Sequence, residues 1–536
     1  MLRNDVPIIT GDTARNDVMA LEEEYRNRIK QDFAGRKNLV LISDGWSSLK
    51  SNFTLYSIMI GYLDPNYNMR QQLVGMVDVD KASAVNLHRL FCEELFKSDI
   101  NISQFKYAVT DGGTNLKTLC EKLNLERSYC GCHLLHLIME KVIEVGEVKR
   151  MLSKCKSVAT KVSKSSKTRT LLKTKAQEFN INAPLPQNYS KTRWNGSRLL
   201  VKSVKEYIPV LVSLPSFAED LFTLKERLLM EFFIEFTRPF QKATTRFEST
   251  NSSTSELLPY LSLLKRNVSE IYSIFLERAD VLEHADTEVF QRIMSLADEL
   301  LEKRLKKMRE QQLLKMCSYL DPRFCKKQCL SPDEWGLVER DIISHFPEIE
   351  LYNTILKQEP FKQLEDNVML FWKSKRQNLP LLTELASELL TIPASSASTE
   401  RVFSGAGRLM SNRLRNRLSS ESCSSLLLVK AMIGYENFQT ISEEDYGVLD
   451  SDDDRSTCNG LENRTDAPMI GAGDYSPLLD WSNHQIAIRD DGSDMDFDKY
   501  DDPNVPGPSE RRINLRERAT RIPRIQKKNL KSSKSK

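Results

Sequence analysis

Only 40 of the 536 residues are Gly or Pro, against about 12% in average proteins, so the composition favours a helix-rich globular chain over a collagen-like or loop-dominated one. No apolar run reaches the roughly 18 residues that a bilayer span needs, and the first residues lack the apolar core of a signal peptide. Ten cysteines without regular spacing indicate free thiols in a reducing compartment.

The net charge of +3 hides a strong segregation of charge along the chain. Residues 441–510 hold 19 acidic and 4 basic side chains, whereas residues 511–536 hold 1 acidic and 11 basic. Subtracting both from the totals of 77 and 74 leaves 62 basic and 54 acidic residues in 1–440, a net charge of +8. Such a mildly basic body permits a polyanion partner but does not require one.

The N-terminal third of the chain predicts an α/β pattern. Residues 1–35 predict a charged helical lead-in, and strand-like runs follow at 39–42, 53–62 and 73–79. A helix is expected over 82–96, with Val85, Leu87, Phe91 and Leu95 among its apolar positions. A strand at 105–109, a helix at 116–123 and a helical stretch from about 134 complete the pattern.

Residues 135–375 have a helical texture without a fixed repeat, most clearly at 151–175 and 286–314. A further amphipathic helix is expected from Leu381 to Leu390, and Ile392-Pro393 ends it. Residues 441–510 lose this periodicity and gain Asp, Gly, Ser and Pro, which predicts disorder.

A second helix is expected to follow Pro393. Ser395, Ser396 and Ser398 offer N-cap oxygens, Glu400 falls in or near its first turn, and Gly405 and Gly407 are expected beyond it. After a basic connector, a last apolar face is formed by Cys423, Leu426, Leu427 and Ala431. A carboxylate near a helix start is favourable by ~0.3–1 kcal/mol, so Glu400 has a structural explanation as well as a functional one.

Two aspartates directly follow predicted strands: Asp44, before Gly45-Trp46, and Asp111, before Gly112-Gly113. Carboxylates at strand ends can converge at the sheet edge where open α/β folds place their ligands. The alternative for each aspartate alone is a turn or helix cap.

The segment from Ile392 to Ser404, IPASSASTERVFS, together with the later Arg417-Leu418-Ser419, resembles the C-terminal dimerisation region of the hAT transposase superfamily. The resemblance extends over about residues 20–435. It implies an α/β, RNase H-like core interrupted by a large all-α insertion, self-association and DNA as partner, with no membrane. It also implies that Asp44, Asp111 (with Asn115 four residues later) and Glu400 form a DDE catalytic triad.

A DDE triad implies a metal cofactor. Mg²⁺, or Mn²⁺ in its place, prefers hard oxygen ligands, and two such ions assist attack and departure at phosphorus. The resemblance therefore assigns Asp44, Asp111 and Glu400 as metal ligands for DNA strand cleavage and transfer.

Two further motifs match the family. Cys130-Gly131-Cys132-His133 contains its C-x-x-H, and Cys130 and His133 are expected near the active site. Half a zinc site is the alternative, but no second ligand pair lies nearby in sequence, so no structural zinc is expected. Lys191-Thr192-Arg193-Trp194-Asn195 resembles the TRWNS box, which implies that Arg193 and Trp194 contact nucleic acid. Trp194 either stacks on an unpaired base or anchors the helical domain.

The predicted organisation follows the order of these features along the chain. We expect a lead-in at 1–35, a first core segment at 36–140, the helical insertion at 141–370, a second core segment with the dimerisation region at 371–435, an acidic linker at 441–510 and a basic tail at 511–536. Paired basic residues in the tail, including Arg511-Arg512 and Lys527-Lys528, predict nuclear import.

The family usually begins with a BED zinc finger, yet no such ligand pattern occurs before Asp44. Two functions from different classes therefore stay open. One is a transposase, or a derivative with an intact triad; the other is a domesticated, non-catalytic nuclear protein that binds DNA or chromatin and dimerises.

Overall fold

The computed structural model describes residues 10–47, 53–80, 82–189, 194–358, 367–411 and 418–440. Several predictions concern residues outside these ranges: the acidic linker, the basic tail, Arg193 and most of the basic connector that precedes residue 418.

The strands form one mixed six-stranded sheet. They are β1 (Leu39–Ser43), β2 (Gly45–Ser47), β3 (Thr54–Leu63), β4 (Met69–Asp78), β5 (Phe105–Thr110) and β6 (Glu126–Tyr129). β3 is the antiparallel partner of β1, β2 and β4, whereas β1, β5 and β6 run parallel to one another. All five residues of β1 are buried, as expected for a central strand covered on both faces.

Helices make up most of the remaining described chain. The first four helices are α1 (Gly11–Phe33), α2 (Ala84–Phe96), α3 (Thr114–Lys122) and α4 (Gly131–Ile143). The next are α5 (Gly146–Lys164), α6 (Ser166–Glu178), α7 (Asn195–Glu206), α8 (Ile208–Val212), α9 (Leu224–Glu248), α10 (Leu257–Leu276), α11 (Ala279–His284) and α12 (Thr287–Arg309). The last are α13 (Gln312–Leu320), α14 (Pro332–Ile343), α15 (Ile349–Gln358), α16 (Val368–Lys375), α17 (Pro380–Leu389), α18 (Ala397–Ser411) and α19 (Ser420–Thr440).

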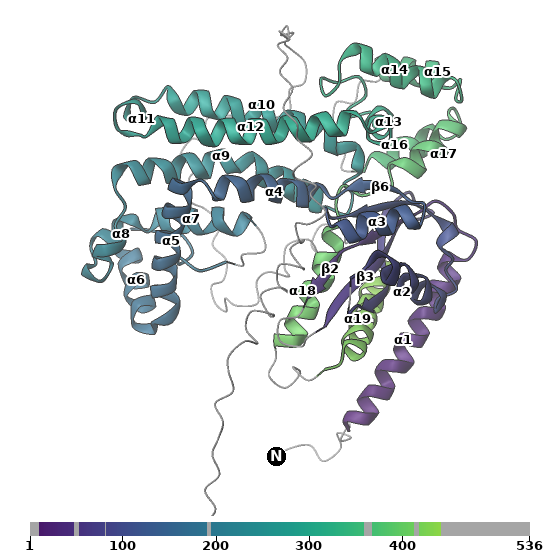
Figure 1. Ribbon diagram of the computed structural model, residues 1–536, viewed down its shortest axis with the longest axis horizontal. Coiled ribbons are helices and arrows are strands. Elements are labelled where there is room, and N and C mark those ends of the chain that lie inside the picture. Colours follow the sequence, from purple (N-terminus) through teal and green to yellow (C-terminus); the bar gives the residue numbers. More distant parts are fainter. Residues whose placement is uncertain are drawn as a thin grey trace, which may run out of the picture.

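Three short 3-10 helices lie at 102–104, 215–220 and 254–256. Figure 1 shows α4, α9, α10 and α12 as long neighbouring helices that extend away from the sheet, with α5 to α8 at the far side. None of the described helices is both long and apolar enough to cross a bilayer.

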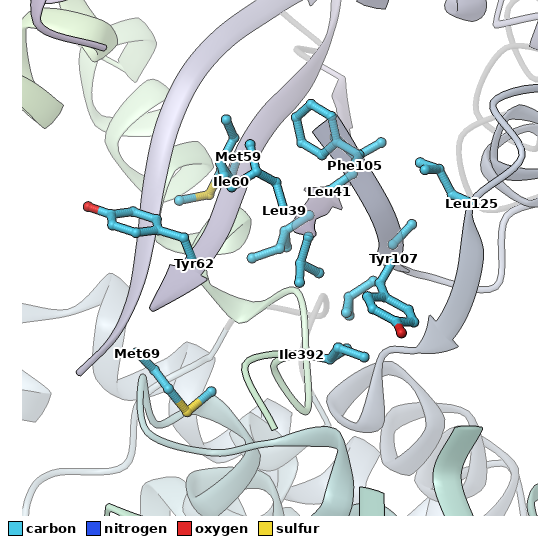
Figure 2. Packing of buried hydrophobic residues seen from close by; sticks show 14 of the residues in the cluster. Leu39, Leu41, Met59, Ile60, Tyr62, Met69, Phe105, Tyr107, Leu125 and Ile392 are labelled. Carbon is cyan, nitrogen blue, oxygen red and sulfur yellow. The ribbon is translucent and has the colours of Figure 1, made fainter. Parts of the chain in front are cut away.

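Buried apolar side chains form two clusters. One contains the strands, α1 to α3 and most apolar positions of 313–432; the other contains the helices between Cys130 and Leu314. Ile392, from the segment that leads into α18, packs in the first cluster with Leu39, Leu41 and Tyr107 of the sheet (Figure 2). The C-terminal segment is therefore part of the core around the sheet.

The predicted mixed α/β class and the order of the main elements are confirmed. Four details are corrected. The predicted helix 151–175 is broken at Ser165, which ends α5 and caps α6 by accepting a hydrogen bond from the Thr168 N–H. The segment 286–314 is divided between α12 and α13. Gly405 and Gly407 lie inside α18 rather than beyond it, and Val85 is exposed.

Candidate active site

Three neighbouring parallel strands end in step at one edge of the sheet. Ser43 of β1 is in register with Thr110 of β5, and Thr110 is in register with Tyr129 of β6. Asp44, Asp111 and Cys130 are the residues that directly follow β1, β5 and β6. Because paired strands lie about 4.8 Å apart, this register brings the three residues to the same edge.

Asp44 occupies a one-residue break between β1 and β2. Its carbonyl accepts a hydrogen bond from Ser57 N (3.1 Å), so the backbone stays attached to β3 across the break. Its Oδ1 accepts from Gly45 N at 2.7 Å. The pairing of β1 with β5 ends at Ser43, so Asp44 lies where the sheet opens.

Asp111 is held by the turn that follows β5. Its Oδ1 accepts from Gly113 N at 3.0 Å. Arg127 donates from Nη2 to the Asp111 carbonyl and from Nε to Thr110 Oγ1, both at 2.7 Å. Arg127 thus fixes the backbone at the end of β5 through oxygens other than those of the carboxylate.

Glu400 comes from the first turn of α18, and the segment before it is anchored to the helical body. Thr254 N donates to the Ile392 carbonyl (2.7 Å), and Ala394 N donates to the Ser252 carbonyl (3.1 Å). Ser395 Oγ donates to the Phe247 carbonyl at 2.6 Å. We call residues 392–395 the strap; its hydrogen-bond partners lie at residues 247–254.

The strap also touches the start of α4. Gly131 N donates to the Ala394 carbonyl at 2.9 Å, and Ser396 N donates to Cys130 Sγ at 3.4 Å. Cys130 is the N-cap of α4, and its sulfur also accepts from His133 N at 3.4 Å. One sulfur therefore joins the end of β6, the start of α4 and the residue before α18.

Gly131 permits this close approach. A Cβ on Gly131 would lie 2.6 Å from Leu257 Cδ2 and 3.1 Å from the Ala394 carbonyl oxygen. The second atom belongs to the backbone and can only move with the strap. A glycine is required here for steric reasons, and a larger residue would displace the segment that carries Glu400.

A buried ionic network supports the other side of the strap. Glu256 pairs with Arg246 (2.6 Å) and Arg323 (2.9 Å), and Arg323 also pairs with Asp321 at 2.7 Å. Ser255 Oγ donates to Asp321 Oδ2 at 2.7 Å. Residues 320–324, LDPRF, thus stabilise the 252–256 turn to which the strap is attached.

The three predicted acids share one electrostatic environment. Burial of its carboxyl group, together with the negative charges of Asp111 and Glu400, raises the pKa of Asp44 well above its usual range, although the Gly45 N–H opposes this. Burial lowers the pKa of His133, while the negative charges of Asp111 and Glu400 oppose that shift. Asp44, Asp111, Glu400 and His133 nevertheless retain intermediate exposure, so solvent reaches the site.

The structure therefore brings together Asp44, Asp111, Glu400, Cys130 and His133. Trp194 lies elsewhere: it is 4% exposed and packs edge-to-face on Phe240 with ring centroids 6.3 Å apart. Its indole Nε1 has no hydrogen-bond partner among the described residues.

Two groups at the site had no distinguishing signal in the sequence. Arg304, on α12, lies close enough to affect the pKa values of both His133 and Tyr129. The hydroxyl of Tyr129 would be 2.1 Å from a Cβ on Gly112, so it packs directly against the turn after Asp111. An arginine in a long charged helix has no pattern that separates it from surface charges, which explains why Arg304 was missed.

Carboxylate oxygens are the ligands that a hard divalent cation prefers, and bound positive charge would relieve the repulsion that raises the pKa of Asp44. Among the described residues, no three His, Cys, Asp or Glu side chains are already close enough to enclose a metal ion.

The repulsion at Asp44 gives a prediction about pH. A carboxyl group whose pKa is raised on folding binds its proton more tightly in the folded state, so its ionisation destabilises the fold as pH rises above the unfolded value of about 3.9. Asp44→Asn should therefore raise the melting temperature of metal-free protein at pH 7, and the gain should shrink as pH falls towards about 4.

Thermal unfolding across this pH range measures the effect. The control is Asp80→Asn at an exposed position, whose free energy of unfolding should stay within about 0.5 kcal/mol of the wild-type value. A lower melting temperature for Asp44→Asn at pH 7 would mean that the carboxylate is stabilised by a partner.

Comparison with known proteins shows what the chain is similar to. Residues 350–433 match the model of the hAT family C-terminal dimerisation region. The chain is 22% identical to a putative AC transposase of Zea mays over 84% of its own length and 64% of that protein. It is 21% identical to a putative AC9 transposase of Zea mays, over 80% of this chain and 61% of the relative. The chain thus spans about three fifths of the length of these relatives.

Proposed function

Because the chain belongs to the hAT transposase family, we propose that it cleaves and joins DNA strands with divalent cations held by Asp44, Asp111 and Glu400. The observation that carries this proposal is the in-step ending of β1 and β5, which places the two aspartates together, with Glu400 within electrostatic range.

The sheet order supports an RNase H-like core. Across the sheet the strands run β4-β3-β1-β5-β6, with β3 antiparallel to β1 and β5 and β6 parallel to β1. In this proposal the core consists of 36–140 and 371–435, and the helical insertion occupies 141–370.

Each group has a separate task in the proposed reaction. When bound, divalent ions would supply positive charge that activates the attacking oxygen and stabilises the leaving one. The carboxylates of Asp44, Asp111 and Glu400 would hold those ions. His133, whose pKa is lowered, is neutral at pH 7 and accepts a hydrogen bond from water at the site without adding positive charge.

Cys130 has a positioning role in this proposal. Its sulfur accepts backbone N–H groups from His133 and Ser396, so it ties the segment before Glu400 to the ends of the strands that carry the aspartates. For Arg193 we keep the proposal of a nucleic-acid contact, whereas the burial of Trp194 against Phe240 favours the alternative that it anchors the helical domain. The matched dimerisation region supports self-association through the C-terminal region of the chain.

Metal-dependent nicking of duplex DNA tests the proposed activity, with Mg²⁺ or Mn²⁺ present or chelated. A purified chain that binds DNA but never cuts it would favour the non-catalytic alternative. A second measurement does not depend on activity: Mg²⁺ should raise the melting temperature of the wild type and have less effect on Asp44→Asn, because ligand binding to the folded state stabilises it.

For localisation, we propose nuclear import through the basic tail. Deletion of 511–536 removes 11 basic residues and should move a fluorescently tagged protein from the nucleus to the cytoplasm. Deletion of the acidic stretch 441–510 is the control and should leave nuclear accumulation unchanged. Nuclear accumulation without 511–536 would exclude the tail as the signal.

A further inference from the structure

The positive charge of the body is concentrated in one pair of helices. Residues 148–177, which cover most of α5 and α6, contain ten Lys and Arg residues and no Asp or Glu. Without them, residues 1–440 hold 62 − 10 = 52 basic and 54 acidic residues, a net charge of −2. The net charge of +8 therefore depends entirely on this segment.

Half of these cations form salt bridges with acids on the same helix or on a neighbouring segment. Salt bridges join Lys149 to Glu144, Arg150 to Glu147, Lys154 to Glu226, Lys161 to Asp220 and Lys175 to Glu178. The side chains of the other five are exposed and form no ion pair or hydrogen bond with any other described residue: Lys156, Lys164, Lys167, Arg169 and Lys173. We call these five side chains the α5–α6 basic surface.

The positive charges of this surface destabilise the isolated protein. Arg169 and Lys173 are spaced i,i+4 on α6, where like charges destabilise a helix by about 0.2–0.5 kcal/mol. Lys167 lies in the first turn of α6, which contains no acid, although the helix dipole favours negative charge there. A bound polyanion would remove both costs.

The location of the surface indicates which portion of a DNA substrate it contacts. α4 begins at the active-site edge, next to Cys130, and its 13 residues span about 20 Å before α5 starts. Figure 1 shows α5 and α6 at the side of the helical body far from the sheet. A phosphate at the active site is therefore out of reach of these lysines, whereas the duplex that flanks it is within reach.

We infer that the α5–α6 basic surface binds the phosphate backbone of duplex DNA flanking the cleavage point, without reading its sequence. The inference rests on the proposed function in taking DNA as the polyanion. Flexible lysines on a helix surface neutralise phosphates and release counterions, which gives affinity that depends steeply on salt.

The test replaces all five side chains with Gln, which keeps helix propensity and removes the charge. A control replaces four exposed lysines and one exposed arginine on other elements with Gln: Lys37, Lys225, Lys306, Lys357 and Arg376. Fluorescence anisotropy with a 30-base-pair duplex, in chelator to prevent cleavage, gives affinity at several salt concentrations. Circular dichroism verifies that both variants fold.

We expect the α5–α6 variant to bind at least tenfold more weakly near 100 mM salt. The slope of log affinity against log salt should become shallower by about 3–5, since each lost phosphate contact contributes ~0.9. The control should stay within about twofold of the wild type. Equal weakening of both variants would mean that only net charge matters, and would overturn the proposal.

Unchanged or tighter binding by the α5–α6 variant would also overturn it. These outcomes are independent of the proposed cleavage. An enzyme that cuts DNA with its acids but binds normally without the five cations refutes only the surface. Binding that needs these cations, without any cutting, refutes only the chemistry.

Discussion

Asp44→Asn, Asp111→Asn and Glu400→Gln should each reduce metal-dependent DNA cleavage by about a thousandfold or more. Metal ions contribute several kcal/mol to stabilisation of the transition state, and each ~1.4 kcal/mol is a factor of ten in rate. The three residues come from the ends of β1 and β5 and the first turn of α18, and each substitution removes one carboxylate from the shared site. Gel assays of nicking and strand transfer with purified protein measure the loss.

The variants must remain folded for this result to be informative. Each substitution keeps the size of the side chain, and Asp80→Asn and Glu121→Gln, at exposed positions, are charge-matched controls that should retain full activity. DNA binding without metal should also persist in the three variants. Retention of cleavage by Glu400→Gln alone would restrict the metal site to the two aspartates.

Leu427→Lys should unfold the protein rather than dissociate it. Leu427 lies within the matched dimerisation region, but it is only 3% exposed within a single chain. α19 packs against α1, β4 and α18, and a Cβ on Gly405 would lie 3.3 Å from Leu427 Cδ2. An unpaired ammonium buried there costs several kcal/mol, a large fraction of the total stability of a typical domain.

Leu381→Lys is the matched control. Leu381 lies within the matched dimerisation region but is 49% exposed, so the same substitution should leave the fold intact. Circular dichroism and sedimentation velocity on the same samples separate folding from self-association. A folded, monomeric Leu427→Lys protein would contradict the packing described for α19.

The sequence was most informative where a local pattern sets the structure. β-branched and aromatic runs predicted β1, β3, β4 and β5, and the Ile392-Pro393 pair predicted the end of α17. β6 was missed because its four residues, Glu126–Tyr129, include two charged side chains and lack an apolar run. The break between α5 and α6 was missed because Ser165 is compatible with a helix interior and acts here as a cap.

The candidate site was only partly visible for a different reason. Asp44, Asp111 and Glu400 were found through strand ends and a family motif, both of which are contiguous in sequence. The strap was not predicted, because its hydrogen bonds join backbone atoms of 252–254 to those of 392–394, and backbone pairing across such a separation leaves no sequence pattern. Arg304 reaches the site only through the packing of α12 against α4.

The long separation of Glu400 from the aspartates has a consequence for the timing of activity during synthesis. Glu400 follows Asp111 by 400 − 111 = 289 residues, and the segment before it is anchored to residues 252–254. At about 5–20 residues per second, a ribosome needs roughly 15–60 s to add those residues. A nascent chain therefore carries both aspartates, and even the turn to which the strap is attached, well before it can complete the proposed triad. Chains released early, or cleaved before residue 392, would carry the α5–α6 basic residues but would lack the third carboxylate of the proposed site.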